Sequence, residues 1–118
     1  MMPSHPQATF LLAAFNAEDT IARAIDSALS QTGISVEVVV VDDCSADRTA
    51  EIVAAYSDPR VRLIRLEKNR GPGGARNAGL NAASGDWIVI LDADDAVSPD
   101  RTERMIAHEG SAGTDRRR

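Results

Sequence analysis

The carboxylates best placed to do chemistry are Asp92, Asp94 and Asp95, which follow the apolar run 87–91. Such a run predicts a buried strand, and residues two apart on a strand point to the same side, so Asp92 and Asp94 can converge. Two carboxylates about 4 Å apart repel by about 4 kcal/mol at an effective dielectric constant of about 20. Mg²⁺ or Mn²⁺ would offset this repulsion, and such ions commonly bring phosphates with them. The pattern predicts a phosphate-bearing ligand held through a metal. The competing interpretation is that Asp94 and Asp95 only cap the following loop.

A second acidic pair, Asp42 and Asp43, follows another apolar run. One of the pair is expected to cap the next helix, and the other can accept hydrogen bonds from a ribose hydroxyl or a base imide. The glycine-rich segment 71–74 is expected to be a loop, but it is not the dinucleotide fingerprint, because Arg76 replaces the third glycine. Arg70 and Arg76 are the candidate phosphate contacts. For each of them, an alternative of equal weight is a side chain that points into solvent and binds nothing.

The elements that must position these residues alternate along the chain. Strands are expected at 9–14, 36–41, 61–66 and 87–91, and helices over 21–29, around 52–56, at about 75–83 and at 98–108. Asn16 is expected to cap the first helix, and its backbone could also line a ligand pocket. Alternation of this kind predicts an α/β fold, a Rossmann-like parallel sheet of about four strands with flanking helices. Ligands of such sheets bind at the carboxyl ends of the strands, where the polar segments lie.

Composition narrows the function classes. The 118 residues carry a net charge of −5, which argues against nucleic-acid binding. Cys44 is the single cysteine, so no disulfide framework is expected and a reducing compartment is favoured. No apolar run approaches the roughly 20 residues that a transmembrane helix needs. We expect a flexible N-terminus at 1–8, one domain at 9–109 and a disordered tail at 110–118.

Five segments in register resemble a known family. They are 14–18, 27–32, 41–45, 69–71 with 75–79, and 91–95. Together they resemble the N-terminal, nucleotide-sugar-binding half of a family 2 glycosyltransferase of GT-A fold, over roughly residues 8–108. The sequence is also similar to bacterial exopolysaccharide enzymes of the succinoglycan type.

The resemblance implies an inverting transfer from a nucleotide diphosphate sugar, commonly UDP-linked, to a saccharide or lipid-linked acceptor. Backbone near Phe15 and Asn16, with Asp42 or preferably Asp43, would hold the base and ribose. Asp92 and Asp94, with Asp95, would bind ribose and Mg²⁺ or Mn²⁺; the metal ligands would be Asp94 and Asp95.

The family's catalytic base lies beyond the metal motif, so none is assigned here. We expect the 118 residues to bind donor weakly, to transfer sugar inefficiently and to self-associate through exposed apolar surface. A cytoplasmic location is expected, with a peripheral position at the inner membrane face left open.

Three other functions compete with this interpretation. A non-catalytic nucleotide-binding module would need only the donor pocket. A phosphoacceptor receiver domain would place its acidic pair after the first strand and a lysine after a late one, whereas Lys68 follows the third expected strand. A Mg²⁺-dependent phosphohydrolase would normally need a later lysine and more acidic ligands.

Overall fold

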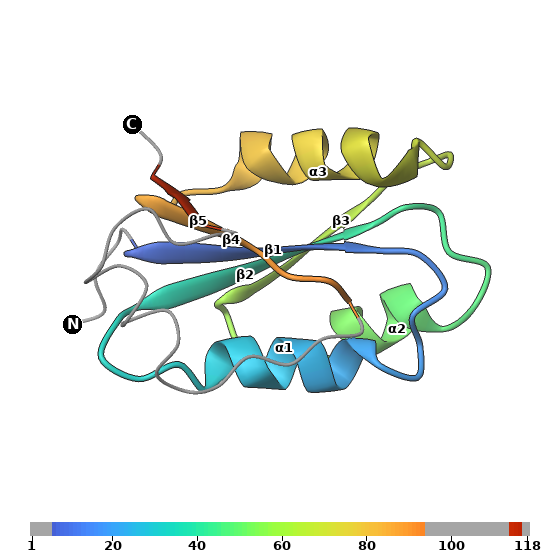
Figure 1. Cartoon of the computed structure of the whole chain (residues 1–118). Coiled ribbons are helices and arrows are strands. Elements are labelled where there is room, and N and C mark those ends of the chain that lie inside the picture. The colour runs from blue at the N-terminus through green and yellow to red at the C-terminus, as the bar shows by residue number, and fades with distance from the viewer. Residues whose placement is uncertain (1–5, 94–113, 117–118) are drawn as a thin grey trace.

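The computed structural model describes residues 6–93 and 114–116, in which strands and helices alternate as far as β4 (Figure 1). The elements are β1 (Ala8–Ala14), α1 (Ile21–Leu29), β2 (Val36–Asp42), α2 (Thr49–Ala54), β3 (Val61–Arg65), α3 (Gly71–Ala82), β4 (Trp87–Ile90) and β5 (Thr114–Arg116). They form one sheet in the order β3-β2-β1-β4-β5. Strands β1 to β4 are parallel, and β5 pairs antiparallel with β4. The predicted parallel sheet of four strands is therefore confirmed.

Alternate residues of the central strands pack against opposite helical layers. Phe10 and Leu12 of β1 belong to the core shared with α1, whereas Leu11 between them packs on the other side, against the α3 layer. Helices α1 and α2 cover one face of the sheet and α3 covers the other (Figure 1). Because β1 and β2 are covered on both faces, they read as nearly continuous apolar runs.

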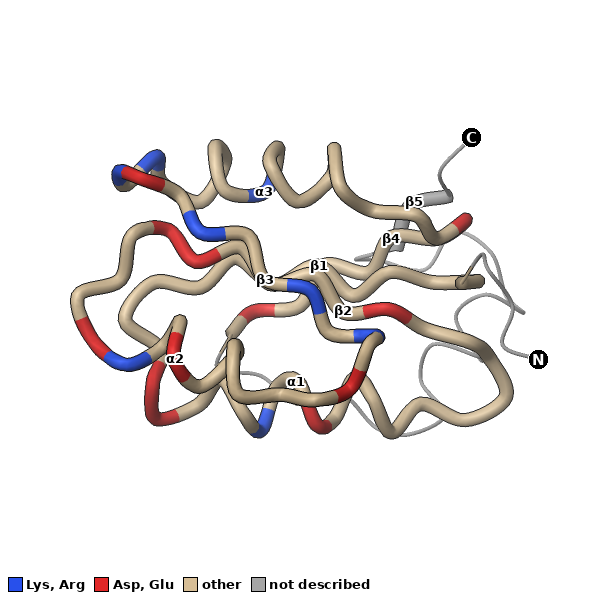
Figure 2. Tube along the Cα trace, turned by 180° about the vertical axis from the view of Figure 1, so that it is seen from behind, with Lys and Arg blue, Asp and Glu red and all other residues tan. Residues whose placement is uncertain are grey.

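Strand β3 is more exposed than β1 and β2. Its five residues are intermediate or exposed, with Arg62 and Arg65 exposed. Figure 2 shows basic residues, in blue, on β3 and on the segment between β3 and α3. Charged side chains on an outer strand discourage pairing with another chain.

The strand order places a switch point at the carboxyl end of β1. From β1 the chain moves through β2 to β3 on one side, and then returns to β4 on the other side of β1. Ligands of open parallel sheets bind at the carboxyl end of the strands beside such a switch point.

The opposite end of the sheet is fixed by a buried carboxylate. The side chain of Glu37 is 9% exposed and accepts hydrogen bonds from the Thr9 hydroxyl (2.6 Å) and from the Ser84 N–H (2.6 Å). Arg62 Nη1 lies 3.2 Å from Glu37 Oε1, and the Gly85 N–H donates to the Thr9 hydroxyl at 2.9 Å. These bonds attach the turn before β4 to β1 and β2.

Helix α3 begins earlier than the sequence predicted. The glycine-rich segment expected to be a loop forms its first turn, with Pro72 in that turn and Gly71 at φ 78°. Proline suits a helix start because its missing N–H would have no partner there. Ala75 and Gly79 face the sheet and are buried. Packing of α3 on the sheet therefore compensates for the poor helix propensity of residues 71–74, three glycines and a proline.

Two further expectations are wrong. Asn16 does not cap α1: Thr20 occupies that position, and Asn16 has φ 51° and accepts a hydrogen bond from the Ala46 N–H. Within the tail expected to be disordered, Thr114–Arg116 forms β5. The helix expected at 98–108 lies outside the described residues.

Candidate functional site

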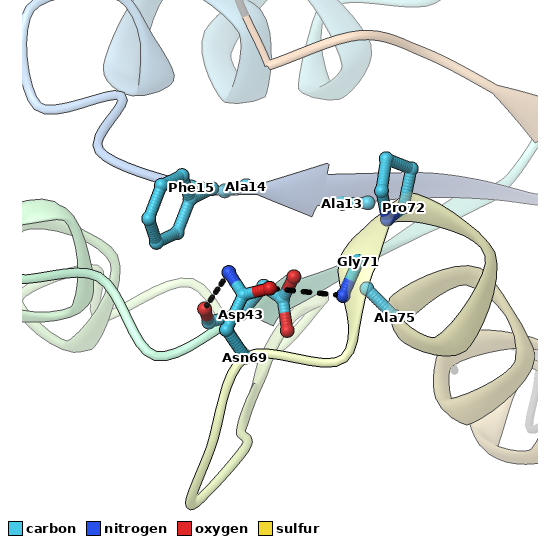
Figure 3. Close-up of a pocket in the computed structure, with 8 residues that line it drawn as sticks. All are labelled: Ala13, Ala14, Phe15, Asp43, Asn69, Gly71, Pro72 and Ala75. Carbon is cyan, nitrogen blue, oxygen red and sulfur yellow. Dashed lines mark hydrogen bonds between the residues drawn. The ribbon is translucent and has the colours of Figure 1, made fainter.

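Two adjoining pockets occupy the carboxyl edge of the sheet. The first has a volume of about 290 Å³ and is lined by Ala13, Ala14, Phe15, Asp43, Asn69, Gly71, Pro72 and Ala75 (Figure 3). The second has a volume of about 560 Å³ and is lined by Ala13, Phe15, Asn16, Ala17, Asp19, Thr20, Asp92 and Ala93. Ala13 and Phe15 line both, so one ligand can extend from the first pocket into the second. Together they match the size of small-molecule sites.

Asp43 is the fixed polar group of the first pocket. Asp43 is 4% exposed, and its Oδ1 accepts a hydrogen bond from the Arg70 N–H at 2.7 Å. Asn69 braces the same corner, because its Nδ2 donates to the Asp43 carbonyl (3.2 Å) and its Oδ1 accepts from the Gly71 N–H (3.1 Å). Within residues 6–93, Asp43 Oδ2 has no hydrogen-bond partner. The pocket therefore presents one free acceptor atom.

Two rings border this acceptor. In Figure 3 the Phe15 and Pro72 rings stand at opposite ends of the pocket, with the Asp43 carboxylate between them. Phe15 is 53% exposed and is the one large exposed hydrophobic side chain among the described residues. An exposed aromatic ring at a pocket rim is suited to packing against a flat ligand.

The second pocket is acidic. Asp92 is exposed at its wall, and Asp19 lines it from the β1–α1 loop. Carboxylate oxygens are the ligands that Mg²⁺ and Mn²⁺ prefer. Asp94 and Asp95, the predicted metal ligands, lie outside the described residues. In the part of the chain that is described, no group of three or more His, Cys, Asp or Glu residues is placed to hold a metal ion.

The remaining predicted site residues do not line either pocket. Asp42 is 1% exposed and its Oδ1 accepts from the Ser45 N–H at 3.3 Å. Neither Asp42 nor Asp43 caps α2, contrary to expectation, because Arg48 holds that position without a side-chain cap. Arg70 and Arg76 are exposed beside and on α3 and contribute to neither lining.

The β1–α1 loop does not offer its first amides to an anion. The N–H groups of residues 16, 17 and 18 donate to Ser45 Oγ (2.9 Å), Thr49 Oγ1 (2.8 Å) and Asp47 Oδ2 (3.2 Å), respectively. A phosphate at this edge would therefore be neutralised by a cation or an arginine rather than by these amides.

Sequence reasoning missed three pocket residues. Pro72 lies in segment 71–74 and Asn69 lies two residues before it, and neither they nor Asp19 were named as site residues. Asparagine directly before Arg-Gly-Pro was the available signal, since Asn side chains often bond to the amide two residues on.

Comparison with known proteins identifies the family. The profile described as Glycosyl transferase family 2 matches residues 9–115. The chain belongs to glycosyltransferase family 2. This assignment confirms the predicted resemblance and sets aside the receiver-domain and phosphohydrolase alternatives.

Family 2 relatives match this chain over most of its length. Succinoglycan biosynthesis protein ExoO of Rhizobium meliloti is 65% identical over 108 residues, which cover 92% of this chain and 31% of ExoO. The glucosyltransferase WfaP of Escherichia coli, named for UDP-Glc and a diphosphoundecaprenol-linked acceptor, is 40% identical over 74% of this chain and 35% of its own. The chain thus spans about a third of the length of these relatives.

Solved structures agree with the family assignment. Staphylococcus aureus TarS in complex with UDP-GlcNAc has a TM-score of 0.77 and 32% identity, covering 86% of this chain and 30% of its own. A Pyrobaculum calidifontis mannosyltransferase in complex with GDP-Man and Mn²⁺ has a TM-score of 0.68 and 32% identity. The match covers 78% of this chain and 28% of the mannosyltransferase. The predicted GT-A architecture is confirmed by this likeness. Among the described residues, no helix is long and apolar enough to cross a membrane.

Proposed function

We propose that this chain is the donor-binding half of an inverting glycosyltransferase that uses a nucleotide diphosphate sugar, with UDP favoured, in bacterial exopolysaccharide synthesis. The observation that carries the proposal is the free Oδ2 of Asp43, held between Phe15 and Pro72. The names of relatives support a UDP-sugar donor and a saccharide or lipid-linked acceptor.

The Asp43 carboxylate favours a base that carries an imide N–H. Its Oδ1 is occupied by the Arg70 N–H, which fixes the carboxylate and leaves Oδ2 as an acceptor. Uracil offers an imide N–H at the ring position where cytosine has an unprotonated nitrogen, and that nitrogen would face the carboxylate with a lone pair. A hydrogen bond from a neutral donor to a charged acceptor is worth about 1.5–3 kcal/mol. The pocket is therefore expected to prefer UDP over CDP.

The second pocket suits the diphosphate and its metal. Asp92 and Asp19 provide oxygen atoms there, and we propose Asp94 and Asp95 as the further ligands of Mg²⁺ or Mn²⁺. When bound, the cation would stabilise the negative charge of the departing nucleotide. The amides of the β1–α1 loop are engaged elsewhere, and this supports a metal-dependent site.

The role of these 118 residues is donor binding rather than the complete reaction. We assign no catalytic base among the described residues, and the matched stretch is 31% of ExoO. We propose that acceptor activation uses residues outside this chain, that the chain alone transfers sugar inefficiently, and that it self-associates. A place at the cytoplasmic face of the membrane is proposed from the lipid-linked acceptor in the name of WfaP. The second candidate, a non-catalytic nucleotide-binding module, uses the same first pocket.

Calorimetric titration with UDP, CDP and GDP, each with and without Mn²⁺, tests the proposal. We expect UDP with Mn²⁺ to bind most tightly, and Asp43→Asn to weaken UDP binding about tenfold or more. Asp94→Asn should remove most of the Mn²⁺ dependence. Glu67→Gln, an exposed carboxylate outside both pockets, is the matched control. Equal affinity for UDP and CDP, or full affinity in Asp43→Asn, would contradict the proposed base contact.

A further inference from the structure

Two loops at the carboxyl edge are joined through Ser45, Asp47 and Thr49, and none of these three residues lines either pocket. Residues 16–18 of the β1–α1 loop donate their amides to Ser45, Thr49 and Asp47, and the Ala46 N–H donates back to Asn16 Oδ1 at 2.9 Å. We call Ser45, Asp47 and Thr49 the loop clamp. Its members stand about 30 positions from the amides that they hold.

The clamp is internally braced. Thr49 is fully buried, and its hydroxyl accepts from the Ala17 N–H and donates to Asp47 Oδ1. Asp47 Oδ1 also accepts from the Thr49 N–H at 3.0 Å, while Oδ2 accepts from the Glu18 N–H. Burial raises the pKa of the Asp47 carboxyl, but the hydrogen bonds from Thr49 and Glu18 outweigh it and hold that pKa below its ordinary value. The carboxylate is thus the charged anchor of the clamp.

The clamp holds a backbone conformation that the chain does not favour by itself. Asn16 has φ 51° and Cys44 has φ 62°, so each loop contains one non-glycine residue in the left-handed region. Such conformations persist only where surrounding contacts stabilise them. For Asn16, those contacts are its amide on Ser45 Oγ and its side-chain oxygen on the Ala46 N–H.

These two left-handed residues adjoin the two sides of the first pocket. Phe15 precedes Asn16 and Asp43 precedes Cys44, so the clamp joins the loop that carries the ring to the loop that carries the acceptor. A backbone bond from the Asp43 N–H to the Ala14 carbonyl at 2.8 Å continues the same connection. Beyond this backbone bond, the clamp fixes the residues that directly follow Phe15, so it is placed to set the position of the ring relative to Asp43 Oδ2.

We propose that Ser45, Asp47 and Thr49 are positioning residues for the nucleotide base, setting the gap between Phe15 and Asp43 without touching the ligand. This inference rests on the proposed function, because it assigns the base to the first pocket. The competing view is that the three side chains only satisfy loop amides and stabilise the fold.

The experiment separates affinity from stability in the full chain. Thr49→Val removes the hydroxyl but keeps the shape, Thr49→Ser restores the hydroxyl, and Ser45→Ala removes a second acceptor. Ser57→Ala, an exposed serine just beyond α2, is the matched control. The readouts are the UDP dissociation constant with Mn²⁺ at a temperature where every variant is folded, the melting temperature, and hydrogen exchange at the amides of Ala17 and Glu18.

We expect Thr49→Val to raise the dissociation constant about five- to tenfold, because the variant loses the hydroxyl that holds the Ala17 N–H and that donates to Asp47. Ser45→Ala should raise it by less, Thr49→Ser should bind within about twofold of the native chain, and Ser57→Ala should match it. Exchange at Ala17 and Glu18 should be faster in Thr49→Val.

Two outcomes would overturn the inference, and a third separates it from the proposed function. A Thr49→Val chain that melts earlier but binds UDP with unchanged affinity would show a purely structural role. Unchanged exchange at Ala17 would show that the hydroxyl does not hold the loop. If the native chain binds none of UDP, CDP and GDP, the proposed function is wrong and base positioning fails with it, whereas the exchange rates still report whether the clamp holds the loop.

Discussion

Removing the buried carboxylate of Glu37 should destabilise the fold by several kcal/mol. Glu37→Ala leaves the fully buried Thr9 hydroxyl without its acceptor and the Ser84 N–H without its partner. An unsatisfied buried donor costs about 1–3 kcal/mol, which applies in full to the Thr9 hydroxyl. Ser84 is exposed, so its N–H can bond to water and adds less, and the two together should cost about 2–4 kcal/mol. Arg62 adds less than about 1 kcal/mol, because its side chain is 44% exposed and water can replace the carboxylate.

Urea unfolding followed by the fluorescence of Trp87, the single tryptophan, measures this change. Glu37→Gln keeps one acceptor oxygen and should lose about half as much stability. The control is Glu51→Ala, whose side chain is 74% exposed and pairs only with the exposed Arg48, so its free energy of unfolding should change by less than about 0.5 kcal/mol. A Glu37→Ala chain within about 1 kcal/mol of the native chain would refute the assignment of this network as a structural anchor.

Four further results are expected. Gly79→Ala should lower the free energy of unfolding in urea by about 1–2 kcal/mol, because the new Cβ would lie 2.6 Å from the buried Leu11 side chain. Gly73→Ala is the control, because a Cβ there meets nothing within 4 Å and should not destabilise the fold. Burial and the hydrogen bond to Asp26 raise the pKa of Tyr56 above 10.0. The phenolate absorbance of this single tyrosine should therefore appear at a higher pH than in a free tyrosine, and at a lower pH in Asp26→Asn than in the native chain. The corresponding stability is present below the unfolded pKa and lost as pH rises through the folded one. Because the pKa of Asp47 is lowered in the folded state, its contribution to the free energy of unfolding is present above pH 3.8 and is lost as the pH falls through the folded pKa. The amide chemical shifts of the β1–α1 loop should report this titration. Chelation of divalent ions with EDTA should weaken UDP binding in calorimetry, and unchanged affinity would count against the metal.

Much of the fold could be predicted because its signals are local. Continuous apolar runs indicated β1 and β2 as strands, and the polar residues that follow them indicated the edge where both pockets lie. Asp43 and Phe15 were named from that edge and both line the first pocket. Arg62 and Arg65 are typical of a more exposed strand, and β3 is one.

The errors arose where distant residues decide the local structure. Asn16 looks like a helix cap in its own sequence context, but groups about 30 residues away hold it in a left-handed turn. The glycines before Ala75 argue against a helix, yet packing of α3 on the sheet makes one. Strand β5 forms by pairing with β4 across more than 20 intervening residues, which the composition of the tail does not reveal.

A crystal structure of the chain with UDP and Mn²⁺ tests the central claim most directly. We expect the uracil ring in the first pocket between Phe15 and Pro72, with its imide N–H within hydrogen-bond distance of Asp43 Oδ2 and the diphosphate directed toward Asp92. A uracil ring outside this pocket, or one that leaves Asp43 Oδ2 without a contact to the base, would contradict it.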